Sequence, residues 1–126
     1  MKPRVLITEA IHRAGWDLLA GETEAVAWKG EATESLAAAL EGAQAAIVRV
    51  AKFSADVIRG AKQLKIIAKH GVGYDNIDVK AATECGVVVT FTPAANSQSV
   101  AEHALALMFA VARRIGDFSR DMAVRQ

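Results

Sequence analysis

The sequence contains a single cysteine, Cys85, among its 126 residues. One thiol cannot form an internal disulfide or a cysteine-based zinc cluster, so neither is expected to hold the fold together. Cys85 follows Glu84 and precedes Gly86 and an apolar run, and free cysteines are commonly buried. We therefore predict that Cys85 packs at the end of a helix.

An excess of one charge and long hydrophobic runs are also missing. Fifteen Lys and Arg residues face fourteen Asp and Glu residues, so nothing in the charge balance favours nucleic acid or a membrane surface as a partner. No run approaches the roughly 18 apolar residues of a membrane span. The apolar run Val5–Ile7 is too short for the core of a signal peptide. The sequence predicts a cytoplasmic protein that binds neither nucleic acid nor a membrane surface.

What is present is an alternation of short apolar runs and helical patterns. Apolar residues make up 52% of the chain, enough for one domain with a real core. Apolar spacing, Gly stops and Thr33, Ser54 and Asp78 as N-caps delimit the helices. The predicted strands are Val5–Thr8, Glu24–Trp28, Ala45–Val50, Leu64–Ala68 and Val87–Phe91. The predicted helices are Ala10–Ala20, Glu34–Glu41, 54–59 and Val79–Cys85.

This fivefold alternation with apolar strands predicts an α/β fold, a parallel sheet with helices on both faces. A flavodoxin-like doubly wound order fits best, and ligands of such sheets bind beyond the carboxyl ends of the strands. Arg49, the Gly71 loop and the segment after Phe91 fall at that edge. A receiver-like domain is disfavoured because only Thr8 and Glu9 follow the first strand, without an acidic cluster.

The alternation ends at Pro93, and one uninterrupted helix is predicted from Ser99 to Arg120. Ser99 and Glu102 have the spacing of a capping box. The helix would be about 30 to 40 Å long, whereas a body of about 95 residues has a radius of gyration near only ~12 Å. Its first half is apolar on all sides, which is typical of a helix buried on several sides. We expect another domain, another subunit or both to cover it.

The segment Gly71–Val72–Gly73 follows a buried strand and precedes a helix. Glycines at 71 and 73 allow a turn that exposes successive backbone N–H groups, which form a nest for a small anion. The alternative is a plain strand-to-helix turn. The segment is not a dinucleotide fingerprint, because GxGxxG requires a third glycine where this sequence has Asn76.

Three further residues are candidates for ligand contacts. Arg49 ends an apolar strand, and its guanidinium suits a carboxylate or phosphate, although a surface arginine or an ion pair at the sheet edge fits as well. Asn96 and Ser97 stand between a strand end and a helix, where they either position polar ligand atoms or close the turn. The three histidines form no recognisable triad, and no motif of a metal site is present.

Together these features resemble the D-isomer-specific 2-hydroxyacid dehydrogenases, a family that includes phosphoglycerate, hydroxypyruvate/glyoxylate, D-lactate and formate dehydrogenases. The resemblance covers essentially the whole chain and is weakest before Ala45. The combination of the glycine loop, the Asn-Ser pair and the Val-Ala-Glu helix start at this spacing is highly specific. The matching segments are Leu64–Asp78, Ala81–Ala82, Gly86–Val87, Thr92–Pro93, Asn96–Ser97 and Val100–His103.

The resemblance implies a role for each candidate residue. In the family, loop amides matching Val72 and Gly73 hold the substrate carboxylate, and the residue matching Val72 also lies near the nicotinamide of NAD or NADP. The arginine matching Arg49 often contacts acidic groups of the substrate. Asn96 matches an asparagine that positions the substrate, and Ser97 matches a neighbour of the cofactor. The long helix matches one that opens the Rossmann nucleotide domain and packs across a homodimer two-fold.

The resemblance also implies that much of the enzyme lies outside this sequence. The family's GxGxxG motif, its residue that selects the cofactor and its catalytic Arg, Glu and His lie downstream, so none is expected here. Residues 1–95 would be an incomplete substrate-binding domain and residues 96–126 the start of the nucleotide-binding domain. This portion alone is expected to bind a 2-hydroxy or 2-keto acid without transferring hydride.

Two hypotheses about function remain open. The first is the substrate-binding portion of an NAD(P)-dependent D-2-hydroxyacid dehydrogenase. The second is a non-enzymatic module of the same fold, carboxylate-binding or corepressor-like. Several acids, and both NAD and NADP, are compatible with the sequence. A phosphorylated substrate would require more basic groups than Arg49, Lys52 and Lys69.

Overall fold

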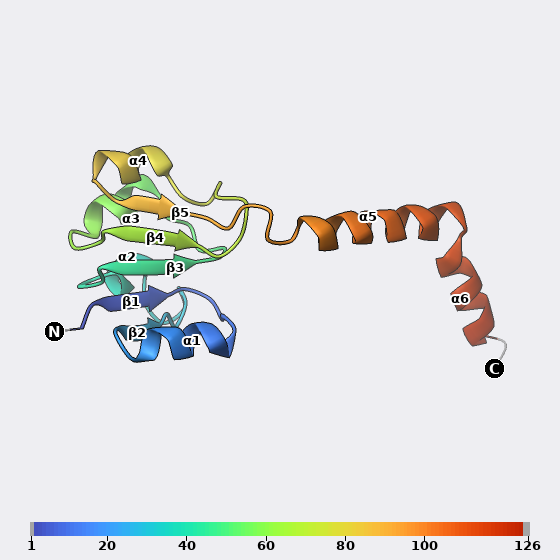
Figure 1. Ribbon diagram of the computed structural model, residues 1–126, viewed down its shortest axis with the longest axis horizontal. Coiled ribbons are helices and arrows are strands. Elements are labelled where there is room, and N and C mark those ends of the chain that lie inside the picture. Colours follow the sequence, from blue (N-terminus) through green and yellow to red (C-terminus); the bar gives the residue numbers. More distant parts are fainter. Residues whose placement is uncertain (1, 125–126) are drawn as a thin grey trace. The chain divides into compact units, whose positions relative to one another are not determined.

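The computed structural model describes residues 2–124. The chain divides into two compact units, the first ending at Pro93 and the second beginning at Ala94. Five parallel strands form the sheet of the first unit, in the order β2-β1-β3-β4-β5 (Figure 1). This order confirms the predicted flavodoxin-like doubly wound fold. The strands are β1 Arg4–Ile7, β2 Glu24–Ala27, β3 Ala45–Val48, β4 Ile66–Lys69 and β5 Val88–Thr90.

The helices of the first unit begin where a side chain satisfies their free backbone N–H groups. Ser54 and Asp78 are N-caps as predicted, and Asp78 accepts a 2.9 Å hydrogen bond from the N–H of Ala81. The second predicted helix start was wrong, because Ser35 and not Thr33 is the cap. The predicted start of the first helix at Ala10 was also wrong, because His12 is the N-cap and the helix begins at Arg13. The helices are α1 Arg13–Ala20, α2 Leu36–Ala39, α3 Ala55–Gly60 and α4 Val79–Glu84.

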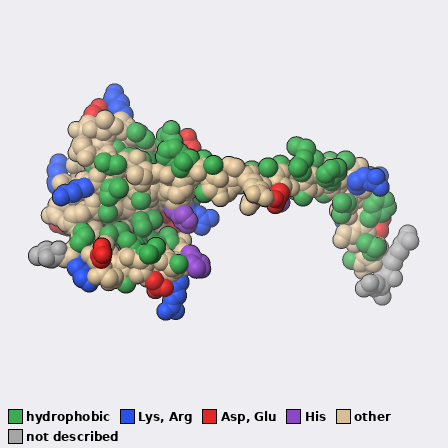
Figure 2. All heavy atoms as spheres, in the orientation of Figure 1, with side chains coloured by type: hydrophobic (Ala, Val, Ile, Leu, Met, Phe, Trp, Pro, Cys, Tyr) green, Lys and Arg blue, Asp and Glu red, His purple; other side chains and the backbone are tan. Residues whose placement is uncertain are grey.

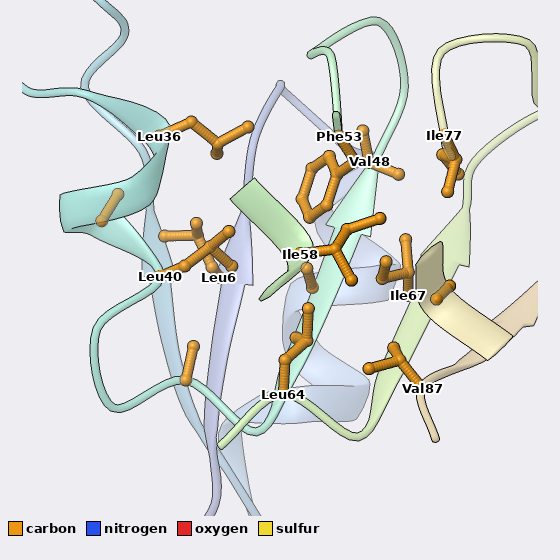
Figure 3. Close-up of a cluster of buried hydrophobic side chains, with 14 of the residues drawn as sticks. Leu6, Leu36, Leu40, Val48, Phe53, Ile58, Leu64, Ile67, Ile77 and Val87 are labelled. Carbon is orange, nitrogen blue, oxygen red and sulfur yellow. The ribbon is translucent and has the colours of Figure 1, made fainter. Parts of the chain in front are cut away.

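The main core lies between one face of the sheet and the helices α2, α3 and α4. Alternate residues of the central strands point to this face, as Leu6 and Ile67 do in Figure 3. Phe53 is fully buried there, although it lies in the loop after β3. Its burial contributes about 1.5 to 3 kcal/mol and fixes that loop against the sheet. The labelled core side chains are Leu6, Leu36, Leu40, Val48, Phe53, Ile58, Leu64, Ile67, Ile77 and Val87.

Cys85 is exposed, which contradicts its predicted packing role. The helix α4 ends one residue earlier, at Glu84, and Cys85 is its C-cap. Ala81 and Ala82 within the helix, and Val87 after it, fill the buried positions instead.

The second unit contains two helices, α5 Ser97–Ala112 and α6 Ile115–Val124, so the prediction of one uninterrupted helix was wrong. The break lies at Arg113 and Arg114, where Arg114 has a left-handed φ of 51°. The Arg114 guanidinium donates a 2.8 Å hydrogen bond to Asp117 in the first turn of α6. An acidic residue there also suits the positive end of the helix dipole. These local contacts stabilise a new helix start.

The predicted capping box at Ser99 and Glu102 was also wrong. The helix α5 begins two residues earlier, at Ser97, because the turn before it has Ala94 at a φ of 60° and a bond from the N–H of Ser97 to its carbonyl. Ser99 therefore lies inside the helix. Glu102 accepts a 2.9 Å hydrogen bond from the side chain of Gln98.

Large apolar side chains of the second unit are exposed along both helices (Figure 2). No residue of α5 or α6 is buried. Within residues 2–124, no helix combines the length and apolar character that a membrane span requires. The exposed residues are Val100, Leu105, Leu107, Met108, Phe109, Val111, Ile115, Phe118, Met122 and Val124.

Candidate functional site

Three loops meet at the carboxyl edge of the sheet, toward which the strand arrows of Figure 1 point. They follow β1, β3 and β4, and the last contains the glycine segment. Their placement follows from the parallel topology, which brings the carboxyl ends of adjacent strands to one edge. This is the edge at which the sequence predicted a ligand site.

The glycine loop begins with a turn that requires its first glycine. Gly71 has a φ of +141°, a conformation that residues with a side chain rarely adopt. Its N–H donates to the carbonyl of Lys69 at 3.1 Å, and its own carbonyl accepts from the N–H of Thr92 at 3.0 Å. The loop is thereby anchored to the segment that follows β5.

The next two backbone N–H groups, those of Val72 and Gly73, have no acceptor within residues 2–124. Val72 itself is 41% exposed. A Cβ at position 73 would lie 3.3 Å from a carboxylate oxygen of Asp75, tighter than ordinary contact. The N–H groups of Tyr74, Asp75 and Asn76 likewise have no acceptor within the described residues, so the loop offers a run of free donors that begins at Val72 and Gly73, as an anion nest requires.

Arg49 lies just past the end of β3, which stops at Val48 and not at Val50 as predicted. Its backbone N–H donates to Glu9 at 2.7 Å, and its carbonyl accepts from the Lys69 ammonium. Its guanidinium is exposed and has no hydrogen bond or ion pair within the described residues. The predicted alternative of an ion pair at the sheet edge is therefore not seen among these residues, and the exposed guanidinium fits both a surface arginine and a ligand contact.

Glu9 is a structural residue of this edge that no sequence pattern marks. Its carboxylate accepts hydrogen bonds from the N–H groups of Arg49, Val50 and Ala51 at 2.7, 3.0 and 2.6 Å and from the hydroxyl of Thr8 at 2.5 Å. Burial raises the pKa of the Glu9 carboxyl, but these four hydrogen bonds outweigh burial and keep the pKa below its ordinary value. Glu9 therefore fixes the loop after β3 as a carboxylate.

Lys69 is the second such residue, since the sequence marked it only as a basic group and not by its structural role. The predicted strand ended at Ala68, but β4 includes Lys69, whose side chain is buried. Its ammonium donates to the carbonyl of Arg49 and, at 2.8 Å, to the side-chain oxygen of Asn76. The Asn76 amide in turn donates to the carbonyl of Ala51 at 2.7 Å. A lysine that follows three apolar strand residues and precedes a glycine loop is the one sequence signal for this arrangement.

An aromatic pair and a hollow flank the loop. The rings of Tyr74 and Phe91 are tilted at 57° with centroids 5.4 Å apart, and both are exposed. The hollow has a volume of about 310 Å³ and brings two histidines to one place, but His12 already accepts the α1 cap hydrogen bond. Within residues 2–124 no cluster of three metal-binding side chains exists. The hollow is lined by Ile11, His12, Gly15, Ile47, Ala68, Lys69, His70 and Thr92.

The structure brings together only some of the predicted site residues. Arg49, Val72 and Gly73 lie at the carboxyl edge of the first unit. Asn96 and Ser97 belong to the second unit, as the N-cap and the first residue of α5. The Asn96 side chain makes no capping hydrogen bond, so its amide is available for another contact.

The chain matches the family model for the catalytic domain of D-isomer specific 2-hydroxyacid dehydrogenases over residues 5–123. It is 38% identical to a glyoxylate reductase of Korarchaeum cryptofilum, over 95% of this chain and 37% of that protein. It is 42% identical to a D-3-phosphoglycerate dehydrogenase of Archaeoglobus fulgidus, over 94% of this chain and 23% of that protein.

A solved structure shares the fold. It is an NADPH-dependent glyoxylate/hydroxypyruvate reductase from Sinorhizobium meliloti in complex with NADP and malonate. The TM-score is 0.71 at 28% identity, over 87% of this chain and 34% of that chain.

The parallel sheet with a glycine loop at its carboxyl edge defines the class of protein, a flavodoxin-like α/β domain. The family match over residues 5–123 goes further: the chain belongs to the D-isomer specific 2-hydroxyacid dehydrogenase family, as the resemblance predicted. It spans well under half the length of the relatives it matches.

Proposed function

We propose that this chain is the substrate-binding portion of an NAD(P)-dependent oxidoreductase that moves hydride between nicotinamide and a D-2-hydroxy or 2-keto acid. The observation that carries the proposal is the pair of free N–H groups of Val72 and Gly73 at the carboxyl edge of the sheet. Two adjacent donors held in place before a ligand arrives suit a carboxylate, because the protein does not have to reorganise. Membership in the 2-hydroxyacid dehydrogenase family indicates that this carboxylate belongs to a 2-hydroxy or 2-keto acid.

The remaining site residues divide between substrate and cofactor. Arg49, with its free guanidinium, contacts acidic groups of the substrate, and Asn96 orients the substrate through its amide. Val72 and Ser97 would each contact the nicotinamide, which takes or supplies the hydride when NAD or NADP is bound. The residues present fit only a small part of such a cofactor, because Asn76 interrupts the glycine spacing that a pyrophosphate loop needs.

This division of the site extends to the domains. Residues 1–95 form the substrate-binding domain, and residues 96–126 begin the nucleotide-binding domain. The catalytic Arg, Glu and His are supplied from outside these 126 residues, so this chain alone binds substrate without turnover. The share of each relative that it spans, 37% and 23% for the two curated relatives, supports this reading.

We further propose a homodimer through the predicted segment Ser99–Arg120. The support is the row of exposed apolar side chains on α5 and α6, which water would otherwise cover at a cost of about 25 cal/mol per Å². We also propose that the protein is cytoplasmic. Its ligand is a small acid, and neither nucleic acid nor a membrane is a partner.

Isothermal titration calorimetry on this chain tests the proposed function. Glyoxylate, hydroxypyruvate, pyruvate and 3-phosphoglycerate are titrated, with pyruvamide as the neutral control that keeps the shape of pyruvate without its charge. We expect saturable binding of at least one acid and none of pyruvamide. Absence of binding by every acid would overturn the proposal. Oxidation of NADH or NADPH by this chain with a 2-keto acid would contradict the proposed division of labour.

A further inference from the structure

Lys69 is the one lysine or arginine side chain that the described part of the chain buries, with 9% of its surface exposed. It is the last residue of β4, two positions before Gly71. Taking an ammonium out of water costs several kcal/mol unless it gains partners. Burial of this ammonium beside the glycine loop must therefore be offset by its partners or by a role in the site.

The hydrogen bonds of Lys69 join two loops of the carboxyl edge. The ammonium donates to the carbonyl of Arg49 after β3 and to the Asn76 side chain in the glycine loop, the latter at 2.8 Å. Asn76 closes the link, since its side-chain NH₂ donates to the carbonyl of Ala51 at 2.7 Å and its backbone carbonyl accepts from Phe53 at 2.8 Å. The glycine loop is thus held at its far end against a loop that the core itself fixes.

Both partners of the ammonium are neutral oxygens. Within residues 2–124, no carboxylate oxygen lies within 4.0 Å of the Lys69 nitrogen. The nearby Glu9 carboxylate is engaged by backbone N–H groups. A buried positive charge without a counter-ion raises the local potential, and an anion at the adjacent loop would lower the energy of both charges.

We propose that Lys69 is a positioning residue for the anion site of the glycine loop. Through Arg49 and Asn76 it holds the loop in the conformation that presents the N–H groups of Val72 and Gly73, and its charge favours a carboxylate there. It acts through these hydrogen bonds and its charge, and does not itself touch the ligand. This role rests on the proposed function, because the bound carboxylate is the anion that it serves.

The test compares three variants of the 126-residue chain. Lys69→Met keeps the length of the side chain and removes the charge and the donors, and Lys69→Arg keeps both. Lys52→Met is the matched control: Lys52 is exposed on the neighbouring loop after β3 and has no ion pair or hydrogen bond within the described residues. It removes the same charge from the same edge of the sheet.

The first readout is the dissociation constant of oxamate, a carboxylate that resembles pyruvate, followed at the Val72 and Gly73 amides by NMR. Loss of a charged hydrogen-bond donor predicts weakening by about tenfold or more in Lys69→Met. We expect Lys69→Arg to retain most of the affinity and Lys52→Met to change it less than about twofold.

The second readout needs no ligand. The ¹⁵N heteronuclear NOE of Val72 and Gly73 is compared with that of Ile67 in β4. In the wild type the loop should be nearly as ordered as the strand, and in Lys69→Met its values should fall while those of Ile67 stay. A purely structural lysine would lower global stability without this local effect. Should Lys69→Met fail to fold, Asn76→Ala removes the other end of the same hydrogen bond and yields both readouts.

The outcomes separate this proposal from the function on which it rests. A wild-type chain that does not bind oxamate, although Lys69→Met loosens its loop, overturns the carboxylate role and leaves the positioning of the loop standing. Unchanged loop order together with unchanged affinity in Lys69→Met overturns the role of Lys69. Equal weakening by Lys52→Met also overturns it, because the effect would then be one of net charge.

Discussion

The Glu9 carboxylate accepts a 2.6 Å hydrogen bond from the backbone N–H of Ala51, which lies 42 positions later in the chain. The same carboxylate binds the N–H groups of Arg49 and Val50, so one side chain after β1 satisfies three successive donors of the loop after β3. Lys69 binds the same loop through the carbonyl of Arg49. The loop next to the proposed anion site is therefore fixed by two opposite charges.

The first prediction concerns Glu9 and pH. Because its pKa is lowered on folding from an ordinary value of 4.5, the carboxylate contributes stability that is fully present above that pH and is lost as the pH falls through the folded-state pKa. Glu9→Gln removes the charge and should cost about 1 to 3 kcal/mol at neutral pH. Urea unfolding of both proteins, from neutral pH to about pH 3, measures the difference.

The difference between the two proteins should shrink toward zero at low pH, because a protonated Glu9 and a glutamine are alike. Glu22→Gln is the matched control, since Glu22 is exposed and makes no side-chain hydrogen bond or ion pair within the described residues. A difference that stays constant with pH would show that the Glu9 charge is not what holds the loop.

The strands and the glycine loop could be predicted from the sequence because their determinants are local, and the strand order followed from the few topologies that right-handed β-α-β connections allow. Apolar runs, glycine stops and caps such as Asp78 lie within a few residues of the elements they define. Glu9 and Lys69 could not be assigned in this way. Their partners are mostly backbone atoms, 40 to 42 positions away for Glu9 and 20 for Lys69 with Arg49, and a backbone N–H or carbonyl carries no residue identity.

The break at Arg114 was missed for a related reason. The helical pattern continues through this position, and only the left-handed φ of Arg114 and its pairing with Asp117 separate α5 from α6. A non-glycine residue at positive φ is uncommon, so it is not expected from the pattern, and no strong breaker such as proline marks the site. The candidate residues of the loop were found because glycine itself is the signal.

The second prediction tests that signal at Gly71. Its φ of +141° is strained for any residue with a side chain, although a Cβ there would meet the Lys69 side chain only at an ordinary 3.7 Å. Gly71→Ala should therefore cost about 1 to 3 kcal/mol through the backbone and not through a clash. If the loop relaxes, the N–H groups of Val72 and Gly73 turn away and oxamate binding weakens with it.

The control is Gly60→Ala, at the end of α3. Gly60 has no positive φ, and a Cβ added to it would meet no other atom within 4 Å, so alanine there should be neutral or stabilise by up to about 1 kcal/mol. Thermal unfolding of the two variants gives the comparison. Equal stability of Gly71→Ala and Gly60→Ala would mean that the turn does not need its glycine.

The third prediction follows from the exposure of Cys85. A thiol at the C-cap of α4, outside the core, should react with a disulfide reagent such as DTNB in the native state, at a rate near that of an unfolded peptide. Cys85→Ser should remove the reaction and leave stability within about 0.5 kcal/mol. Labelling that occurs only after addition of denaturant would restore the packing role first predicted for this residue.

The last prediction concerns the apolar surface of α5. Leu105 and Phe109 are 55% and 63% exposed and lie one helical turn apart, so they share one face. Exposed side chains of this size on a helix without any buried residue are typical of an interface. Sedimentation equilibrium should therefore find the wild-type chain as a dimer. The double variant Leu105→Glu and Phe109→Glu should be a monomer, because association would bury two unpaired carboxylates.

His103→Glu adds a charge to the same helix at a position that is already polar, and should leave the dimer intact. This control matters because α5 is apolar over most of its circumference, and added charge alone could weaken association without regard to position. A dimer that tolerates both charges at 105 and 109 would move the interface to α6. A wild-type chain that stays monomeric at high concentration would contradict the homodimer, and the apolar face would then belong against another domain of the same polypeptide.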